Sequence, residues 1–560
     1  MRKRSALAAA LVALAVSLTG CTGIPSDGRV HEGQAAPQGD GPAAVFLPSR
    51  PQKDATKEAI LRGFIDAASS PENKYEIARE FLTPTFREEW KPDAGVTVDG
   101  GGAIVPLTVD DHTMQVSVDP VAEVNASGEY REFDSTKPTP LRYTFAMVDG
   151  QWRISGAPDG IVIDENTFSY VFSPQSLYFF DPSFNYLVPD LRWFPRGATA
   201  PTRIVKALLA GPASWLDQAV ITAFPEGTEL TADAVQVVGR DAKVDLNQEA
   251  LGADRITAER MKYQLENSLP SGLSVTVTVN QNTQDIGELG PDAPVVDPHV
   301  DARPLILRKG TFGFLPSSGT DLEQIPGLSG VVAGLDPTAV SVSPGQTRAA
   351  VLTSSGVFGV ETGEKPELLD PRSGLIAPSI DTFGYVWSVP SERPDELVVY
   401  GPAGDAVPVK TPWKEFTGIS SLKVSRDGTR LVAVLRSATE TRFVAAAISR
   451  DSGRPTGVGD PLLLASDIGT ARDAAWVDDL TVAVLTTDAD DQPRILTQEI
   501  AGLRSPLEPP PDSVGIVGGN SVRELRTLTS DGRLELQRGA GWQERIDDVT
   551  LMATQQGVTG

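Results

Sequence analysis

The feature that most restricts this 560-residue chain is its single cysteine, Cys21, which directly follows an apolar N-terminal segment. One cysteine can form neither an intramolecular disulfide nor a cysteine-based zinc site. The preceding segment begins with three cations at positions 2–4, continues as an apolar run over residues 5–19, and places Gly20 before the cysteine. This order is typical of a signal peptide, and the run is short for a transmembrane helix, which needs about 20 apolar residues.

Small residues directly before a cysteine are what lipoprotein signal peptidase requires. We therefore predict a signal peptide over residues 1–20, cleavage between Gly20 and Cys21, and lipidation of Cys21. An ordinary secretory signal that happens to contain a cysteine is the alternative. Cleavage would take the formal net charge from −25 to −28, because it removes three cations and no anion. Anionic headgroups repel such a body, so lipid must hold it at the membrane.

No later stretch reaches 18 apolar residues, so we expect a lipid-anchored protein of the cell membrane on its extracytoplasmic face. The net charge of −25 argues against nucleic acid as a partner, because binding to phosphates needs clustered Lys and Arg. Residues 21–52 are rich in Gly, Pro and polar residues without periodicity, and we interpret them as the lipidated cysteine followed by a flexible tether.

The residue types needed for catalysis are sparse. His31, His112 and His299 lie far apart in the sequence, and the chain has no Gly-x-Ser-x-Gly, His-Glu-x-x-His or P-loop motif. Adjacent carboxylates such as Glu88-Glu89 diverge by about 100° on a helix. We therefore expect that the protein is not an enzyme and has no catalytic residue, cofactor or metal ion. A propeller hydrolase is the enzymatic alternative.

Two acidic segments have residue types that can bind a metal ion. The trio Asp110-Asp111-His112 could ligate a metal, but a solvated turn before a strand is the favoured interpretation. The loop Asp488-Ala489-Asp490-Asp491 could hold Ca²⁺, but it lacks the Gly at position six and the Glu at position twelve of an EF-hand.

The first globular part, residues 53–165, changes from helical to strand periodicity. Apolar residues at helical spacing over 59–68 and aromatic residues over 81–90 predict two helical segments. Alternating apolar residues over 114–118 and 141–147, with a turn at Asp149-Gly150, predict antiparallel strands. Helices followed by a curved sheet suggest an α+β cone of the nuclear-transport-factor-2-like (NTF2-like) type.

An aromatic-rich connector covers residues 166–194, and 168–194 hold ten of the 36 aromatic residues of the chain. We favour buried packing between domains over an exposed recognition surface. Residues 195–285 predict a small α+β sandwich, with a helix capped by Thr202 and stopped at Gly211-Pro212, a hairpin around 239–241, a second helix and a last strand. Residues 286–299 are a linker.

Residues 300–560 consist almost entirely of predicted strands. Loose copies of a strand, a Ser-x-(Asp)-Gly turn and a second strand occur over 340–352, 422–435 and 528–534. At about 40–45 residues for each copy, the segment predicts a β-propeller of about six blades. A pair of β-sandwiches is the alternative, because the copies are irregular.

The order of these parts resembles the actinobacterial LpqB lipoprotein family. The resemblance lies in LTGCTGIPSDG around Cys21, the helical stretch EAILRGFIDAASSPENKYEIAREFLTPTFREEW, and LVPDLRW in the connector. The stretch IVKALLAGPASWLDQAVITAFPEGTEL, followed by AKVDLN, resembles the GerMN domain of spore-germination lipoproteins. The resemblance implies that residues 195–285 form a GerMN domain, and that Cys21 becomes an S-diacylglycerol and N-palmitoyl cysteine.

The resemblance also implies a partner. By this resemblance, the chain is expected to engage the extracytoplasmic part of the sensor kinase MtrB and so to modulate phosphorylation of the response regulator MtrA, with effects on envelope homeostasis and division. The alternative is a lipoprotein that binds peptidoglycan or another cell-wall glycan without kinase contact. Trp215 and Phe224 could stack on sugars, although core packing is favoured for both.

Overall fold

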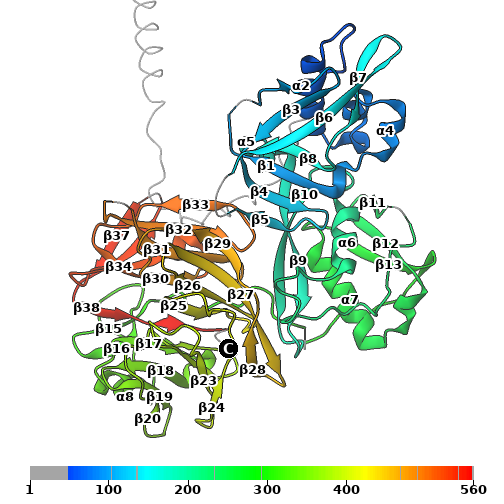
Figure 1. Ribbon diagram of the computed structural model, residues 1–560. Coiled ribbons are helices and arrows are strands. Elements are labelled where there is room, and N and C mark those ends of the chain that lie inside the picture. The colour runs from blue at the N-terminus through cyan, green and yellow to red at the C-terminus, as the bar shows by residue number, and fades with distance from the viewer. Residues whose placement is uncertain are drawn as a thin grey trace, which may run out of the picture. The chain divides into compact units, whose positions relative to one another are not determined.

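The N-terminal domain begins with helices whose apolar face was visible in the sequence. The computed structural model describes residues 48–557 except 103, 134–136, 233, 292, 467, 489 and 540 (Figure 1). Helix α2 (Lys57–Ala68) starts where the Thr56 hydroxyl accepts the amide of Ala59. Four short helices follow it: η1 (Glu72–Lys74), α3 (Glu76–Glu80), α4 (Pro84–Glu89) and η2 (Pro92–Ala94).

Two four-stranded sheets complete this domain, in the orders β5-β4-β1-β8 and β2-β3-β6-β7. All of their pairs are antiparallel except β1 with β8. The strands are β1 (Gly95–Asp99), β2 (Leu107–Thr108), β3 (Thr113–Val118), β4 (Pro120–Asn125), β5 (Tyr130–Glu132), β6 (Thr139–Val148), β7 (Gln151–Gly156) and β8 (Ile161–Asp164).

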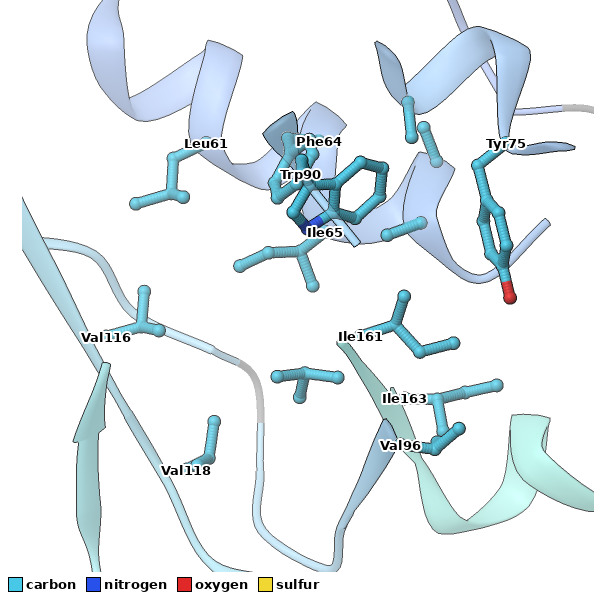
Figure 2. Close-up of a cluster of buried hydrophobic side chains, with 14 of the residues drawn as sticks. Leu61, Phe64, Ile65, Tyr75, Trp90, Val96, Val116, Val118, Ile161 and Ile163 are labelled. Carbon is cyan, nitrogen blue, oxygen red and sulfur yellow. The ribbon is translucent and has the colours of Figure 1, made fainter. Parts of the chain in front are cut away.

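The core of the N-terminal domain lies between α2 and these strands. Figure 2 shows Leu61, Phe64 and Ile65 of α2 in one cluster with Trp90 and with valines and isoleucines of the sheets. The Trp90 indole is 2% exposed, and its ring centroid lies 5.1 Å from that of Phe64. Burial of each such side chain contributes about 1.5–3 kcal/mol to the free energy of folding, so the apolar side of α2 is held against the sheets.

Helix α5 (Glu165–Val171) leads into a two-stranded antiparallel ribbon, β9 (Phe172–Phe180) and β10 (Leu187–Pro195). The ribbon is paired in register along nine residues, from Leu187 opposite Phe180 to Pro195 opposite Phe172. It corresponds to the aromatic-rich connector of the sequence and precedes the second α+β domain, which we call the GerMN domain after the resemblance of its sequence.

The GerMN domain is an α+β sandwich with strand order β11-β12-β13-β14. Its elements are α6 (Ala200–Ala210), β11 (Gln236–Val238), β12 (Asp241–Leu246), η3 (Gln248–Gly252), α7 (Arg255–Ser268), β13 (Ser274–Val279) and β14 (Asn282–Thr283). Strands β12 and β13 are parallel, so α7 serves as their crossover helix. The predicted cap at Thr202 is wrong: α6 begins at Ala200, and the Thr202 hydroxyl accepts the amide of Val235 at 3.0 Å.

The predicted propeller of about six blades is confirmed. In the described part of residues 300–557, the strands form six sheets, in the orders β16-β15-β38, β20-β19-β18-β17-β39, β21-β22-β23-β24, β25-β26-β27-β28 with β29 on β27, β30-β31-β32-β33 and β34-β35-β36-β37. Strands β17, β21, β25, β30, β34 and β38 contact one another in that order, and β38 returns to β17. The sheets therefore form a closed ring.

The elements of the ring are β15 (Leu305–Arg308), β16 (Thr311–Phe314), α8 (Ser329–Gly334), β17 (Ala339–Val342), η4 (Pro344–Gln346), β18 (Arg348–Thr353), β19 (Gly356–Glu361), β20 (Glu367–Asp370), β21 (Ser379–Ile380), β22 (Val386–Ser388), β23 (Val398–Tyr400), β24 (Ala406–Pro408), β25 (Gly418–Val424), β26 (Arg430–Arg436), β27 (Thr441–Asp451), β28 (Arg454–Val458), β29 (Leu462–Ser466), β30 (Asp473–Trp476), β31 (Thr481–Thr487), β32 (Pro493–Glu499), β33 (Arg504–Leu507), β34 (Ser513–Val517), η5 (Val522–Glu524), β35 (Arg526–Thr529), β36 (Leu534–Arg538), β37 (Gly541–Ile546), β38 (Val549–Met552) and β39 (Thr554–Gln555).

The last strands of the chain close this ring. Strand β38 pairs antiparallel with β15, and β39 pairs parallel with β17, so each of two sheets contains strands from both ends of the domain. Figure 1 shows β38, in red, beside the green β15. A closed propeller leaves only short sheet edges at its rim, which limits edge-to-edge association.

Polar side chains near the axis of the propeller join consecutive blades. Each accepts a hydrogen bond from a backbone amide of the next blade: Ser341 from Ile380 at 3.2 Å, Ser379 from Val424 at 3.1 Å, Ser421 from Ala474 at 3.2 Å and Asp473 from Ile516 at 3.3 Å. Buried backbone amides need hydrogen-bond acceptors, and these side chains supply acceptors to amides at the inner strands of the neighbouring blade.

Candidate functional site

The aromatic connector forms the junction between the three domains. All nine residues of β10 are buried, although successive side chains of a strand point to opposite faces. The ribbon is therefore covered on both sides. The interpretation of the connector as packing is confirmed by the burial of Phe172, Phe179, Phe180, Trp193 and Phe194, whereas Tyr170 of α5 is 72% exposed.

A buried ion pair lies at the centre of this ribbon. The Arg192 guanidinium donates to both oxygens of the Asp190 carboxylate, at 3.0 and 2.7 Å, and each side chain is 1% exposed. Burial lowers the pKa of Arg192, but the Asp190 carboxylate outweighs that effect and holds it above the ordinary value. Arg192 also donates to the Ser127 carbonyl at 2.9 Å, and the Ala213 amide donates to Asp190 at 2.7 Å. The pair thus connects the N-terminal domain to the GerMN domain.

The same ribbon contacts the propeller. The Trp193 indole donates to the Ala501 carbonyl at 3.0 Å, and the Tyr186 hydroxyl lies 3.0 Å from that of Thr382. Arg430 of β26, which is fully buried, donates to the Pro189 carbonyl at 3.3 Å and forms an ion pair with Asp427 at 2.5 Å. The described residues belong to one compact unit, and these contacts show how the ribbon joins its domains.

A cleft opens between the N-terminal and GerMN domains beside the ribbon. Its volume is about 780 Å³, within the range of small-molecule sites. The loop from Val124 to Gly128 and the ribbon residues Trp193–Pro195 line it, with helix α6 on the GerMN side. Four lining side chains are cationic, namely Lys74, Arg79, Arg203 and Lys206, and one is anionic, namely Asp93. We call this the basic cleft.

The cations of the basic cleft differ in how they are held. Arg203 pairs with Asp93 at 2.9 Å. Arg79 donates to backbone carbonyls, including that of Lys74 at 3.1 Å, and its guanidinium lies 5.5 Å from the Trp90 ring. Lys74 and Lys206 are exposed, and within the described part of the chain no carboxylate pairs with either lysine or with Arg79. The cleft therefore keeps a net positive charge in a chain of net charge −25.

Part of the lining of the basic cleft comes from a segment with strained backbone, residues 73–75. Asn73, Lys74 and Tyr75 all have positive φ, at 48°, 59° and 62°. Three successive left-handed residues without a glycine are unusual. Tyr75 is buried, and burial, with a contribution from Asp93, raises its pKa. Figure 2 shows its hydroxyl directed away from the Trp90 cluster.

The structure does not gather the candidate catalytic and metal-binding residues of the sequence into one site. Cys21, Gly20 and His31 lie outside the described residues. His112 lies in a turn, where its amide donates to Asp110 at 2.8 Å, and Glu88 and Glu89 are exposed at the end of α4.

The acidic loop after β31 is an ordinary turn. The Asp488 carboxylate accepts the amides of Asp490 and Gln492, each at 2.9 Å, and an ion pair from Arg494. In the part of the chain that the structure describes, no group of three or more His, Cys, Asp or Glu side chains is arranged to hold a metal ion. Phe224 belongs to the GerMN core, and the half-buried Trp215 packs against that core and against the propeller, which confirms the packing interpretation for both.

The basic cleft was missed by sequence reasoning. Its cations come from two separate segments, 74–79 and 203–206, and neither segment contains a basic run. The net charge of the chain pointed away from any cationic site. The four cations come together only where the two domains dock beside the ribbon.

Comparison with known proteins gives matches along most of the described chain. Family models match in chain order: the N-terminal domain of lipoprotein LpqB over residues 50–169, a sporulation and spore germination (Germane) domain over 176–285, and the β-propeller domain of lipoprotein LpqB over 313–551. Among solved structures, TolB from Acinetobacter baumannii aligns with a TM-score of 0.30 and 12% identity over 45% of this chain and 65% of its own, which is too low to carry an inference.

Curated relatives align over most of their length. Lipoprotein LpqB of Cutibacterium acnes is 26% identical over 92% of this chain and 90% of its own, and that of Streptomyces coelicolor is 26% identical over 80% of both. Lipoprotein LpqB of Bifidobacterium longum is 31% identical over 43% of this chain and 44% of its own. No helix among the described residues is long and apolar enough to cross a membrane. With LpqB models at both ends and relatives aligned along nearly the whole length, the chain belongs to the LpqB family of lipoproteins.

Proposed function

We propose that this lipoprotein is anchored through Cys21 at the extracytoplasmic face of the cell membrane, where it modulates a sensor kinase of the MtrB type. Through that kinase it changes phosphorylation of a response regulator of the MtrA type, with consequences for envelope homeostasis and division. The observation that carries the proposal is family membership over most of the chain, combined with an apolar N-terminal segment that ends at the only cysteine.

A protein outside the membrane can alter phosphotransfer inside only by binding one kinase conformation better than another. A difference of about 1–3 kcal/mol between the two conformations changes activity about 5–150-fold. The buried ribbon supports such a role, because a partner bound by one domain is held in a defined position relative to the others. We propose binding rather than catalysis, in keeping with the non-catalytic type of the family and the propeller.

Reconstitution tests this proposal. The kinase is placed in liposomes with the lipidated protein in the same bilayer, and phosphate transfer to the response regulator is followed over time. We expect the rate to change with the amount of lipoprotein, and the unlipidated Cys21→Ala protein to need a much higher concentration for the same effect. An unchanged rate at every lipoprotein density would contradict kinase modulation.

The anchor has its own test. Cys21→Ala should leave the membrane fraction or remain as unprocessed precursor, because the acidic mature chain has no attraction of its own for anionic lipid. Immunoblots of membrane and medium fractions measure this. A processed Cys21→Ala protein that stays fully in the membrane fraction would show that lipid on Cys21 is not the anchor.

The alternative is a lipoprotein that binds cell-wall glycan without kinase contact. One observation favours it, namely the basic cleft between the first two domains. Sedimentation of the purified protein with isolated sacculi, together with an unchanged phosphotransfer rate, would favour this function over kinase modulation.

A further inference from the structure

The basic cleft has the size and charge of a ligand site that the kinase proposal does not use. A volume of about 780 Å³ accommodates a molecule of about disaccharide size. Its lining carries four cations and a single carboxylate, although the chain has 74 Asp and Glu against 49 Lys and Arg. An acidic protein that concentrates cations in a concave site creates a local positive potential, which attracts anions and excludes cationic ligands.

Both walls of the cleft contribute charge. Lys74 and Arg79 come from the N-terminal domain, whereas Arg203 and Lys206 are three residues apart on α6 and so share a face of that helix. An anionic ligand can therefore contact both walls at once.

Two of the four cations, Arg79 and Arg203, are held in position before any ligand arrives. Arg79 is fixed by hydrogen bonds to backbone carbonyls and by the Trp90 ring, and Arg203 is fixed by Asp93. The left-handed backbone of residues 73–75 brings Lys74 and Tyr75 to the cleft. Strained backbone of this kind concentrates at functional sites, and it persists because the surroundings hold it. Preorganised charges lose less entropy on binding than flexible ones.

The rest of the lining is mixed in character. Pro92, Ala207 and Ala210 present small apolar patches, while the loop from Asn125 to Gly128 and the hydroxyl-bearing Thr199 are polar. Sugar rings match such a surface, because they carry hydroxyl groups at their edges and C–H groups on their faces. We propose that the basic cleft binds an anionic saccharide of about disaccharide size, held through its carboxylate or phosphate groups by Lys74, Arg79, Arg203 and Lys206.

This inference does not depend on the kinase proposal, which would stand if the cleft bound nothing. The extracytoplasmic location proposed above only guides the choice of probes. A carboxylate and a phosphate are both available on envelope saccharides, so the experiment includes one probe of each kind.

Calorimetric titration of the full-length lipoprotein in neutral detergent tests the proposal. The probes are muramyl dipeptide, which carries a carboxylate, N-acetylglucosamine 6-phosphate, and neutral diacetylchitobiose. We expect saturable binding of at least one anionic probe and at least about tenfold weaker binding of diacetylchitobiose, because charge supplies most of the attraction. Affinity for the anionic probe should fall as salt is raised, since screening weakens exposed charges.

A double variant locates the binding. Lys74→Asn with Lys206→Gln removes two cations, and asparagine tolerates the left-handed backbone at position 74. We expect at least about tenfold weaker binding of the anionic probe. The matched control, Lys365→Asn with Lys414→Gln, removes two exposed lysines of the propeller and should change affinity less than about twofold.

Three results would overturn the proposal: no saturable binding of either anionic probe up to millimolar concentration, equal affinity for diacetylchitobiose, or unchanged affinity in the double variant. Cleft-dependent binding of the carboxylate probe alone or of the phosphate probe alone supports the proposal and identifies the anionic group. Unfolding curves check that both double variants are folded. If the cleft double variant is not folded, the single variant Lys206→Gln, on the exposed face of α6, replaces it. We then expect the affinity for the anionic probe to fall by at least about threefold.

Discussion

The Asp190–Arg192 pair and the basic cleft both depend on cations near the ribbon, but they treat charge in opposite ways. In the pair, each charge is 1% exposed and has a bidentate partner, and backbone groups of two domains complete the hydrogen bonds. In the cleft, Lys74 and Lys206 are exposed, and the described chain offers them no carboxylate. Charges satisfied inside the protein stabilise the junction, whereas charges left unsatisfied at a concave surface are available to a ligand.

The largest expected effect comes from breaking the pair. Arg192→Met leaves the Asp190 carboxylate buried without its partner, so we expect the free energy of unfolding to fall by about 3–5 kcal/mol. Urea denaturation followed by tryptophan fluorescence measures this change. The double variant Asp190→Leu with Arg192→Met removes both charges, so its free energy of unfolding should fall by less than that of the single variant. An equal or greater loss in the double variant would show that the uncompensated carboxylate is not the cause.

A smaller and pH-dependent effect is expected at Asp479, where the propeller approaches the linker before it. Burial, followed by the negative charge of Asp297, raises the pKa of Asp479 to about 7, and Arg430 opposes this shift. Below about pH 4 the side chain is protonated in both the folded and the unfolded chain. Between pH 4 and pH 7 only the unfolded chain loses the proton, so this residue progressively lowers the free energy of unfolding. Above pH 7 both states have lost the proton, and the lowering of the free energy of unfolding stays constant.

Asp479→Asn should therefore raise the melting temperature relative to the parent chain, and the gain should grow from acidic pH to about pH 8. Differential scanning calorimetry of both proteins across this range measures it. A gain that is the same at every pH, or no gain at pH 8, would contradict the assignment of a raised pKa to this carboxyl group.

The smallest effect on stability is expected from the exposed lysines of the basic cleft. Lys74→Asn with Lys206→Gln removes no described ion pair, so the free energy of unfolding should change by no more than about 0.5 kcal/mol. The same urea titration measures it. A loss comparable to that of Arg192→Met would mean that the cleft cations serve the fold rather than a ligand.

The local elements of this fold were largely predictable because their signals are short-range. The stripe over 59–68 became α2, the Gly239-containing turn became the β11–β12 hairpin, and the Ser-x-Asp-Gly turn at 425–428 joins β25 to β26. The prediction of Thr202 as the cap of α6 was wrong because the helix already begins at Ala200, and the Thr202 hydroxyl accepts a tertiary hydrogen bond from the Val235 amide. That bond spans 33 residues and leaves no local trace.

The candidate site was less predictable than the fold. Aromatic density in residues 168–194 indicated buried packing, which the structure confirms, but the bidentate Asp190–Arg192 pair was not anticipated. The basic cleft depends on how two domains dock and on a left-handed backbone at 73–75, and no periodicity encodes either feature. Lipidation of Cys21 stays a prediction from the sequence.

Surface plasmon resonance can measure binding between the purified full-length lipoprotein in detergent and the extracytoplasmic domain of the MtrB-type kinase, and so tests the kinase proposal directly. We predict saturable binding with a defined stoichiometry, weakened in the Arg192→Met protein because the ribbon no longer fixes the domains relative to one another. The absence of binding by folded protein at every concentration reached, with and without envelope saccharides, would contradict the kinase proposal.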